Sequence, residues 1–176
     1  CEIAIYQNGM ALSYVSEAFK TKELCELAVQ QNGNAIAKVP HSLRTKELCE
    51  LAVKNNGYAL YYIPEKLKNK ELYELAVKKD SLALSYVPNE YKTPELCELA
   101  VKQNGLVLQF VPDECKTLEL CELAVKQNRR ALMDVPYKYR DKLKQYNLDE
   151  IIFELPLDKY QKTFQEIKTF FPKKDI

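Results

Sequence analysis

The sequence predicts an all-α protein, an α-solenoid of six 24-residue repeats followed by a C-terminal helical cap. The main evidence is a heptapeptide, Glu-Leu-Cys-Glu-Leu-Ala-Val, that returns in a single register. Full copies begin at Glu23, Glu47, Glu95 and Glu119, a variant containing Tyr73 begins at Glu71, and a clipped sixth copy occupies residues 1–5. A unit this short cannot bury its apolar face alone, so stacking of neighbouring units is expected.

Each unit also carries start and stop signals for its first helix. Residues whose side chains cap free amides at a helix N-terminus precede the heptapeptides, namely Thr21, Thr45, Asn69, Thr93 and Thr117. The only glycines share one position past the helix end, namely Gly9, Gly33, Gly57 and Gly105. Because glycine adopts a left-handed conformation without strain, we expect positive φ at all four. Ser81 and Arg129, at the equivalent position, should be forced into the same region.

The remainder of each unit predicts two shorter helical pieces. A second apolar segment ends before a proline in five units, at Pro40, Pro64, Pro88, Pro112 and Pro136, and a residue before proline disfavours helical geometry. One more turn then leads to the next cap residue. We therefore expect a long helix, a short helix and a 3₁₀-like turn in every unit. The apolar arc of the long helix is too wide for a single contact face, so it should be flanked on both sides.

The period ends after Asp141, which divides the chain into a repeat array at residues 1–140 and capping helices at residues 141–176. Two helices are expected in the cap, near residues 148–155 and 157–171. The second has one apolar stripe, Leu157, Tyr160, Phe164, Ile167 and Phe171, which we expect to cover the open end of the array. The alternative is a membrane-surface helix, although lysines and acidic residues are mixed on its polar face.

Charge and cysteine placement exclude several function classes. With 26 basic and 25 acidic residues, the chain lacks the basic excess typical of nucleic-acid binders, and no apolar run is long enough to span a bilayer. Five of six cysteines occupy one repeat position, namely Cys1, Cys25, Cys49, Cys97 and Cys121. Stacked helices lie about 8–10 Å apart, beyond disulfide reach. We expect six free thiols and a cytoplasmic location, in the producing cell or in a host cell.

No residue pattern predicts an enzyme. The chain has no C-x₂-C pair and a single histidine, His41, so neither a metal site nor a cofactor site is expected. The glutamate pairs of the heptapeptide recur in every unit, whereas an active site would occur once. Solvent-exposed ion pairing is the better interpretation of these glutamates.

The unit resembles a known family. The run Glu-Leu-Cys-Glu-Leu-Ala-Val-Lys-Gln-Asn-Gly, followed by Leu-Val-Leu-Gln-Phe-Val-Pro and Cys115-Lys116-Thr117, is similar to a domain-of-unknown-function family of short helical repeats in bacterial and giant-virus proteins. The resemblance covers about residues 1–140 and implies a helical repeat often carried within larger proteins. It brings no catalytic residues. The chain departs from the pattern at Ser16, Tyr73, Ser81 and Arg129.

The variable positions of the repeat are the best candidates for a binding surface, because a solenoid keeps its frame and varies its binding face. The residue before the Val or Ile that ends the second segment reads Tyr14, Lys38, Tyr62, Tyr86, Phe110 and Asp134. Lys38 and Asp134 indicate that this position is not sealed inside. The partner-binding candidates are Tyr14, Tyr58, Tyr61, Tyr62, Tyr86 and Phe110. The alternative is that these rings cover the joints between units.

We therefore expect a non-catalytic scaffold that binds a protein or a peptide. The alternative is a non-catalytic arm that positions an enzyme domain within a longer chain. Nucleic-acid binding and a stand-alone enzyme are less favoured, and a basic stripe on the folded surface would be the sign of the former.

Overall fold

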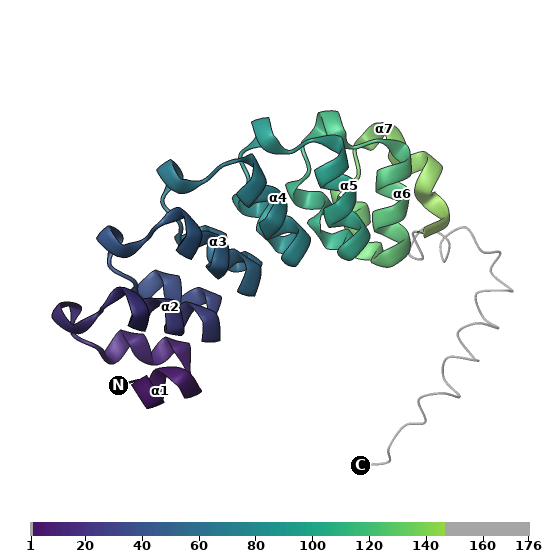
Figure 1. Cartoon of the computed structure of the whole chain (residues 1–176). Helices are drawn as coiled ribbons and strands as arrows, with labels where there is room; N and C mark the ends of the chain where they lie inside the picture. The colour runs from purple at the N-terminus through teal and green to yellow at the C-terminus, as the bar shows by residue number, and fades with distance from the viewer. Residues whose placement is uncertain (1, 147–176) are drawn as a thin grey trace, which may run out of the picture.

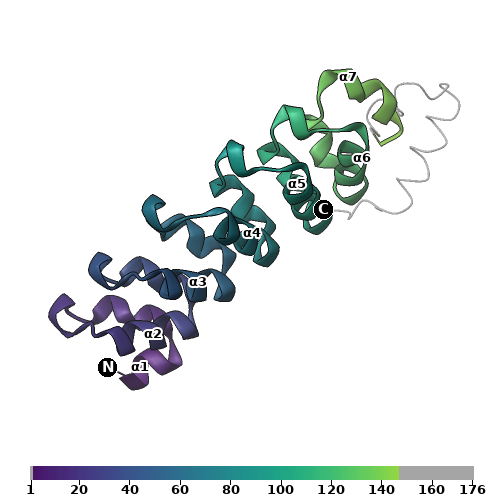
Figure 2. The same cartoon turned by 45° about the horizontal axis from the view of Figure 1, so that its top comes forward.

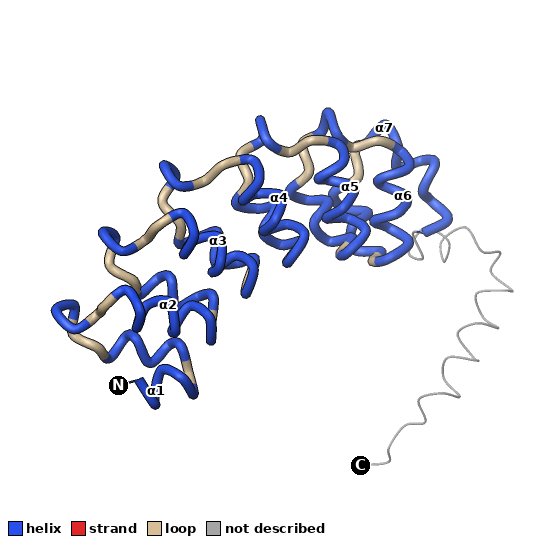
Figure 3. The backbone as a smooth tube through the Cα atoms, viewed as in Figure 1, coloured by secondary structure: helices blue, strands red, loops and turns tan. Residues whose placement is uncertain are grey.

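The fold is a row of similar helical units. The structure, a computed structural model, describes residues 2–146. Figure 1 shows the units stacked in chain order along an arc, with α1 at one end and α6 near the other. The view turned by 45° shows the same single row (Figure 2). Helical segments joined by short loops make up the described chain (Figure 3), and no strand occurs in residues 2–146. The predicted all-α solenoid is confirmed.

Each complete unit contains one α-helix and two 3₁₀-helices. The α-helices are α1 (Glu2–Gln7), α2 (Lys22–Gln31), α3 (Lys46–Asn55), α4 (Lys70–Lys79), α5 (Pro94–Gln103) and α6 (Leu118–Gln127). The six-residue 3₁₀-helices are η1 (Gly9–Tyr14), η3 (Gly33–Lys38), η5 (Gly57–Tyr62), η7 (Ser81–Tyr86), η9 (Gly105–Phe110) and η11 (Arg129–Asp134). Three-residue turns η2 (Glu17–Phe19), η4 (His41–Leu43), η6 (Glu65–Leu67), η8 (Asn89–Tyr91) and η10 (Asp113–Cys115) complete the units.

The α-helices begin where the sequence indicates. In each of α2 to α6 the side chain of the cap residue accepts a hydrogen bond from the amide three residues on, as between Thr45 Oγ1 and Leu48 N at 3.2 Å and between Asn69 Oδ1 and Leu72 N at 2.9 Å. Such a bond satisfies one of the free amides at the N-terminus of a helix. Pro94 occupies the first turn of α5, where its missing N–H costs nothing.

An asparagine or aspartate turns the chain from the α-helix into the six-residue 3₁₀-helix. Asn56 ends α3 by donating its backbone N–H to Ala52 O at 2.9 Å, and its Oδ1 accepts from Tyr58 N at 3.0 Å to cap η5. Its backbone is extended, with φ of −145° and ψ of 116°. One residue therefore ends the α-helix through its backbone N–H and caps the following 3₁₀-helix through its side chain, and this arrangement recurs in the other units.

The prediction of positive φ at the glycines is wrong. No residue in the described chain, glycine or otherwise, has positive φ, so Ser81 and Arg129 are not strained in that region either. The turn uses the extended asparagine instead of a left-handed residue. Each of the four glycines is the first residue of its 3₁₀-helix and faces the next unit, where an added Cβ would collide with the carbonyl oxygen of Ala28, Ala52, Ala76 or Ala124. Glycine is present because two backbones approach closely.

The core runs continuously through the row. Each of α2 to α6 contributes Leu, Cys or Tyr, Ala and Val, and each of η3, η5, η7 and η9 contributes its third and fourth residues, such as Ala59 and Leu60. Each of α2 to α6 packs against a neighbouring α-helix, against the 3₁₀-helix of the preceding unit and against the 3₁₀-helix of its own unit. The predicted two-sided packing is therefore confirmed. Cys25, Cys49, Cys97 and Cys121 are fully buried and free.

The described chain ends in an atypical segment. The four-residue helix α7 (Tyr137–Arg140) continues into η12 (Asp141–Tyr146), where Leu143 is buried. Tyr146 donates its hydroxyl to Glu122 Oε1 at 3.1 Å, which ties this segment to α6. The capping helices expected near residues 148–155 and 157–171 lie outside the described residues.

Candidate partner-binding surface

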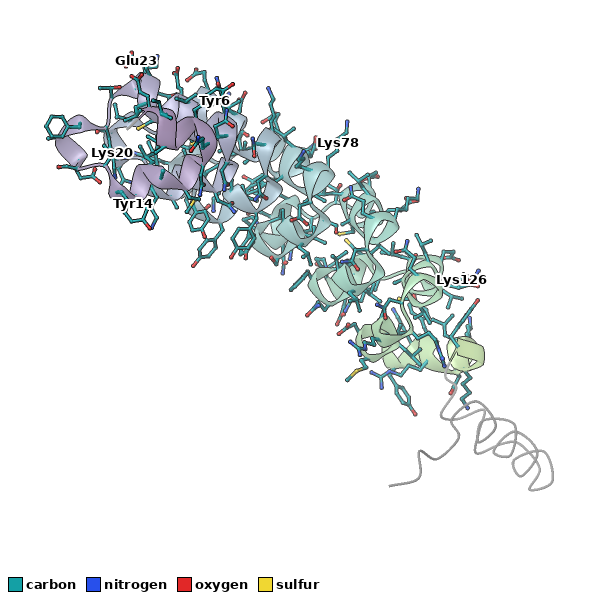
Figure 4. The ribbon with its side chains drawn as sticks, turned by 90° about the horizontal axis from the view of Figure 1, so that it is seen from below. Tyr6, Tyr14, Lys20, Glu23, Lys78 and Lys126 are labelled. Atoms are coloured by element: carbon teal, nitrogen blue, oxygen red, sulfur yellow. The ribbon has the colours of Figure 1, made fainter. Side chains whose placement is uncertain are left out.

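The six-residue 3₁₀-helices stack side by side and give the array a second face. Consecutive members of the series, from η1 to η11, contact each other. Residues three apart eclipse in a 3₁₀-helix, so the second and fifth residues point the same way. The first, third and fourth residues are buried in most units, and the second, fifth and sixth are exposed or half-buried. Figure 4 shows Tyr14, from η1, on one edge of the array and Lys78 and Lys126, from the α-helices, along the opposite edge.

Four of the six candidate residues form a tyrosine cluster. Tyr58, Tyr61 and Tyr62 come from η5 and Tyr86 comes from η7. The Tyr61 ring centroid lies 5.0 Å from that of Tyr62 and 5.2 Å from that of Tyr86, and Tyr58 lies 5.4 Å from Tyr86 with the rings nearly perpendicular. Edge-to-face and offset pairs at such distances are favourable. The cluster spans the joint between the third and fourth units.

The two other candidates lie apart from this cluster. Tyr14 is 92% exposed and Phe110 is half-buried against the core, and neither forms a ring pair within residues 2–146. Inside the cluster, Tyr61 is 56% exposed and Tyr58 is 37% exposed, whereas Tyr62 and Tyr86 are half-buried. The cluster thus has an inner pair, Tyr62 and Tyr86, that packs against the core and an outer pair, Tyr58 and Tyr61, that faces solvent.

The exposed and half-buried positions of the 3₁₀-helices carry no charged side chain over three consecutive units. The exposed and half-buried positions of η5, η7 and η9 define what we call the uncharged strip: Tyr58, Tyr61, Tyr62, Leu82, Ser85, Tyr86, Leu106, Gln109 and Phe110. Charged residues stand at the same positions on both sides of it, as Lys38 in η3 and as Arg130 and Asp134 in η11. Charges make up 29% of the chain, so a strip of nine uncharged surface positions is a local departure from its composition.

The phenol of Tyr86 stays neutral at neutral pH. Its pKa is raised to about 12, mainly by a hydrogen-bond interaction with Tyr58 and secondly by burial. The opposite face is charged, and its exposed ion pairs lie along single α-helices, such as Glu98 with Lys102 at 2.6 Å and Glu122 with Lys126 at 2.8 Å. The array therefore has an uncharged, largely aromatic strip over three units of one face and paired charges along the α-helices of the opposite face.

A basic side chain follows each three-residue turn or its equivalent, buried at Lys20, exposed at Arg140 and half-buried in the four units between them, and sequence reasoning missed it. The residue before the cap position is basic in every unit: Lys20, Arg44, Lys68, Lys92, Lys116 and Arg140. Arg44 donates to Val39 O at 2.9 Å and to Tyr62 O of the next unit at 3.0 Å. Lys92 donates to Phe110 O at 2.8 Å, and burial lowers the pKa values of both groups. A basic residue at one position in six units is the sequence signal that predicts such a role.

The cations that reach the next unit bind the last carbonyl of its 3₁₀-helix. Lys20 makes the same bond to Lys38 O at 2.9 Å, and a positive charge is favourable at a helix C-terminus. Lys68 and Lys116 instead pair with acidic residues of their own turns, Glu65 and Asp113. The bonds to carbonyls hold the backbone of the strip without engaging its side chains.

Carboxamides provide a second link between units. Asn55 Oδ1 accepts from Gly33 N at 3.0 Å and its Nδ2 donates to Gln30 O at 2.7 Å. Gln127 makes the equivalent pair of bonds, with Gly105 N at 2.9 Å and Lys102 O at 3.0 Å. Lys79 occupies this position in the fourth unit, and no such bond joins it to Gly57 in the described chain. A polar cavity of about 440 Å³, lined in part by Gly57 and Lys79, lies at that joint.

The side chains with potential chemistry do not converge. No group of three or more His, Cys, Asp or Glu residues between residues 2 and 146 is placed to hold a metal ion. Burial raises the pKa of Cys49 to about 11 and that of Cys97 to about 12, which disfavours the nucleophilic thiolate. His41 is exposed on η4. None of the helices described is long and apolar enough to cross a membrane.

Comparison with known families agrees with the repeat architecture. The model of the family described as "Domain of unknown function (DUF4116)" matches residues 1–44, 45–92 and 93–140, which are consecutive segments. The chain belongs to this family. Each DUF4116 segment spans two of the structural units, because α-helices begin every 24 residues at Lys22, Lys46 and Lys70. No curated protein and no solved structure matches the sequence.

Proposed function

We propose that this DUF4116 array is a non-catalytic scaffold that binds another protein or peptide through the uncharged strip. The observation that carries the proposal is the strip itself: three consecutive units present nine uncharged positions, five of them aromatic, on a chain rich in charge. Large apolar or aromatic patches on a soluble surface are typical of interaction sites. Interface anchors are enriched in tyrosine, which offers contact area for little loss of side-chain entropy.

The support for the strip is suited to this role. Arg44 and Lys92 fix the backbone beneath Tyr62 and Phe110 through carbonyl hydrogen bonds. The 3₁₀-helices are also packed against the core through Ala59, Leu60 and their equivalents. A partner would therefore meet a surface whose backbone is already ordered, which reduces the entropic cost of binding.

The second unit supplies a substitution set that tests the strip without disturbing the frame. It carries Asn34, Ala37 and Lys38 at the positions of the three tyrosines in η5. A graft of these residues, Tyr58→Asn with Tyr61→Ala and Tyr62→Lys, places side chains that the same backbone already accepts. We expect the grafted protein to retain its far-ultraviolet circular dichroism and to melt only modestly lower. Capture of its partner from a native lysate should be lost.

The matched control alters three residues on the opposite face. Lys70→Ala, Glu74→Ala and Lys78→Ala remove charges from α4, of which Lys70 and Glu74 form an exposed ion pair at 3.8 Å. This variant should capture the same partner as the unaltered protein. If the graft unfolds the array, the tyrosines are structural and the proposal fails. If the graft folds and captures as before while the control loses capture, the partner binds the α-helical face and the proposal is again wrong.

A further inference from the structure

The uncharged strip repeats along the array with a spacing that limits the conformations of a bound peptide. Each unit contributes one 3₁₀-helix with three surface positions to the strip, and helices packed side by side lie roughly 8–10 Å apart. A polyproline II helix advances about 3.1 Å per residue and completes a turn in three residues, or roughly 9.3 Å. A β-strand presents one face every two residues, roughly 6.6 Å, and an α-helix has a pitch of about 5.4 Å. Only the polyproline II period matches one repeat unit directly.

The chemistry of the strip favours the same conformation. A polyproline II backbone has no internal hydrogen bonds, so its carbonyls are free to accept. The hydroxyls of the outer tyrosines, Tyr58 and Tyr61, are the donors that the strip offers, and the rings supply apolar area for prolines. Recognition of proline-rich segments by aromatic surfaces is an established binding mode. An α-helical partner would offer the tyrosine hydroxyls no free backbone carbonyls along its length.

Charge further restricts the partner. A charged side chain covered by the strip would lose hydration, and no strip residue carries an opposite charge to compensate for this loss, which makes its burial costly. The charged positions that flank the strip, Lys38 on one side and Arg130 and Asp134 on the other, limit its length to three units. Three turns of polyproline II correspond to about nine residues.

We propose that the uncharged strip binds an uncharged, proline-rich segment of another protein in the polyproline II conformation, with one turn of the peptide on each of η5, η7 and η9. This inference rests on the proposed scaffold function and names the class of its partner. Tyr62, Tyr86 and Phe110 then mark the three successive turns of the peptide. The regular spacing of the 3₁₀-helices, and not a single pocket, selects a peptide in the polyproline II conformation.

The test is a titration with synthetic peptides that carry a terminal tryptophan. The protein contains no Trp, so peptide fluorescence anisotropy reports binding alone. Uncharged proline-rich peptides of six, nine and twelve residues are compared with an uncharged amphipathic helical peptide and with a nine-residue peptide carrying one Glu in each turn. Affinity should rise at least tenfold from six to nine residues and change less than twofold from nine to twelve. The helical and the Glu-containing peptides should bind at least tenfold more weakly than the nine-residue peptide.

Two variants assign binding to the strip. The graft of Asn, Ala and Lys into η5 should weaken binding of the nine-residue peptide at least tenfold. Phe110→Asp, which copies Asp134 of the last unit, should reduce its affinity to that of the six-residue peptide. The control variant on α4 should bind the peptide normally.

The outcomes separate this inference from the proposed function. If no proline-rich peptide binds at about 1 mM, which corresponds to only about 4 kcal/mol of affinity, the inference is wrong. It is equally wrong if the helical peptide binds as well as the proline-rich one or if peptide length has no effect. The scaffold function survives those results when the graft still abolishes capture of a partner from lysate. If the graft changes neither peptide binding nor capture, both proposals are overturned.

Discussion

Replacement of Gly57 by alanine tests the role that the structure gives to the glycines. An added Cβ would lie 2.5 Å from Ala76 O and 2.8 Å from Asp80 Cβ in the next unit. Ordinary van der Waals contact begins at about 3.4 Å, so the two units must separate locally by about 0.9 Å. The obstacle is rigid because Ala76 O also accepts the helix-ending hydrogen bond from Asp80 N at 2.8 Å.

Two opposing effects determine the expected magnitude for Gly57→Ala. Because φ is not positive at this residue, alanine is allowed by the backbone and should stabilise by roughly 0.4–1 kcal/mol through the unfolded state. Overpacking a well-packed contact typically costs about 1–3 kcal/mol. We expect the clash to dominate and the free energy of unfolding to fall by about 1–2 kcal/mol. Urea unfolding followed by far-ultraviolet circular dichroism measures this change, with an unaltered denaturant slope.

Ser81 provides the matched control because it occupies the glycine position and already carries a Cβ. The joint that follows it has accommodated that atom, so Ser81→Gly should change the stability by no more than about 1 kcal/mol. If Gly57→Ala stabilises the protein instead, the two backbones do not approach as closely as described. The glycine pattern would then need another explanation.

Four further predictions follow from the links between units and from the exposed groups. Lys79→Gln should install the missing carboxamide link to Gly57 and stabilise by about 1 kcal/mol in urea unfolding. Arg44→Met removes charged donors from partly buried carbonyls and should destabilise by about 2 kcal/mol in the same assay. Cys115 is half-exposed whereas the described heptapeptide cysteines are buried, so a thiol reagent should modify it before them in native protein, as peptide mass mapping would show. Hydrogen bonding to its own backbone amide lowers the pKa of Glu47 below 4.5 in the folded protein. The ionised side chain therefore stabilises the fold at pH values above the pKa of the unfolded chain, and this stabilisation is lost as the pH falls through the lower pKa of the folded protein. Glu47→Gln should make the free energy of unfolding depend less steeply on pH in the acid range.

The fold was predictable because its signals are local and repeat. Cap residues such as Thr45 and prolines such as Pro64 act on their own segment of chain, and the recurrence of the heptapeptide places every unit in register. The conformation at Gly33 was not predictable in this way. Its sequence context fits a left-handed helix end, but the distinguishing contact is with Ala52 of the next unit, and such an approach depends on how the units stack.

The candidate surface was predicted only in part for the same reason. Alternation of Lys38, Tyr62 and Asp134 at one position indicates an exposed site, and the structure places these positions on one face. The meeting of Tyr58 with Tyr86 across two units depends on the spacing of the stack. The rings of Tyr14 and Phe110 occupy the same repeat position but join no cluster, because the second and fifth positions of their own 3₁₀-helices are not aromatic. The fourth unit, which precedes Phe110, has no aromatic residue at these two positions either.

The bonding pattern of the frame explains how the strip can vary without loss of the fold. In three units a basic side chain donates to the backbone carbonyl of the last residue of the next 3₁₀-helix. Lys20 donates to Lys38 O, Arg44 to Tyr62 O and Lys92 to Phe110 O. A backbone carbonyl is present whatever the side chain, so the same link forms beneath a cation, a phenol or a phenyl ring. The side chain above it is therefore released from any structural hydrogen bond. Substitution at this position changes what the array presents to a partner while the links between units persist.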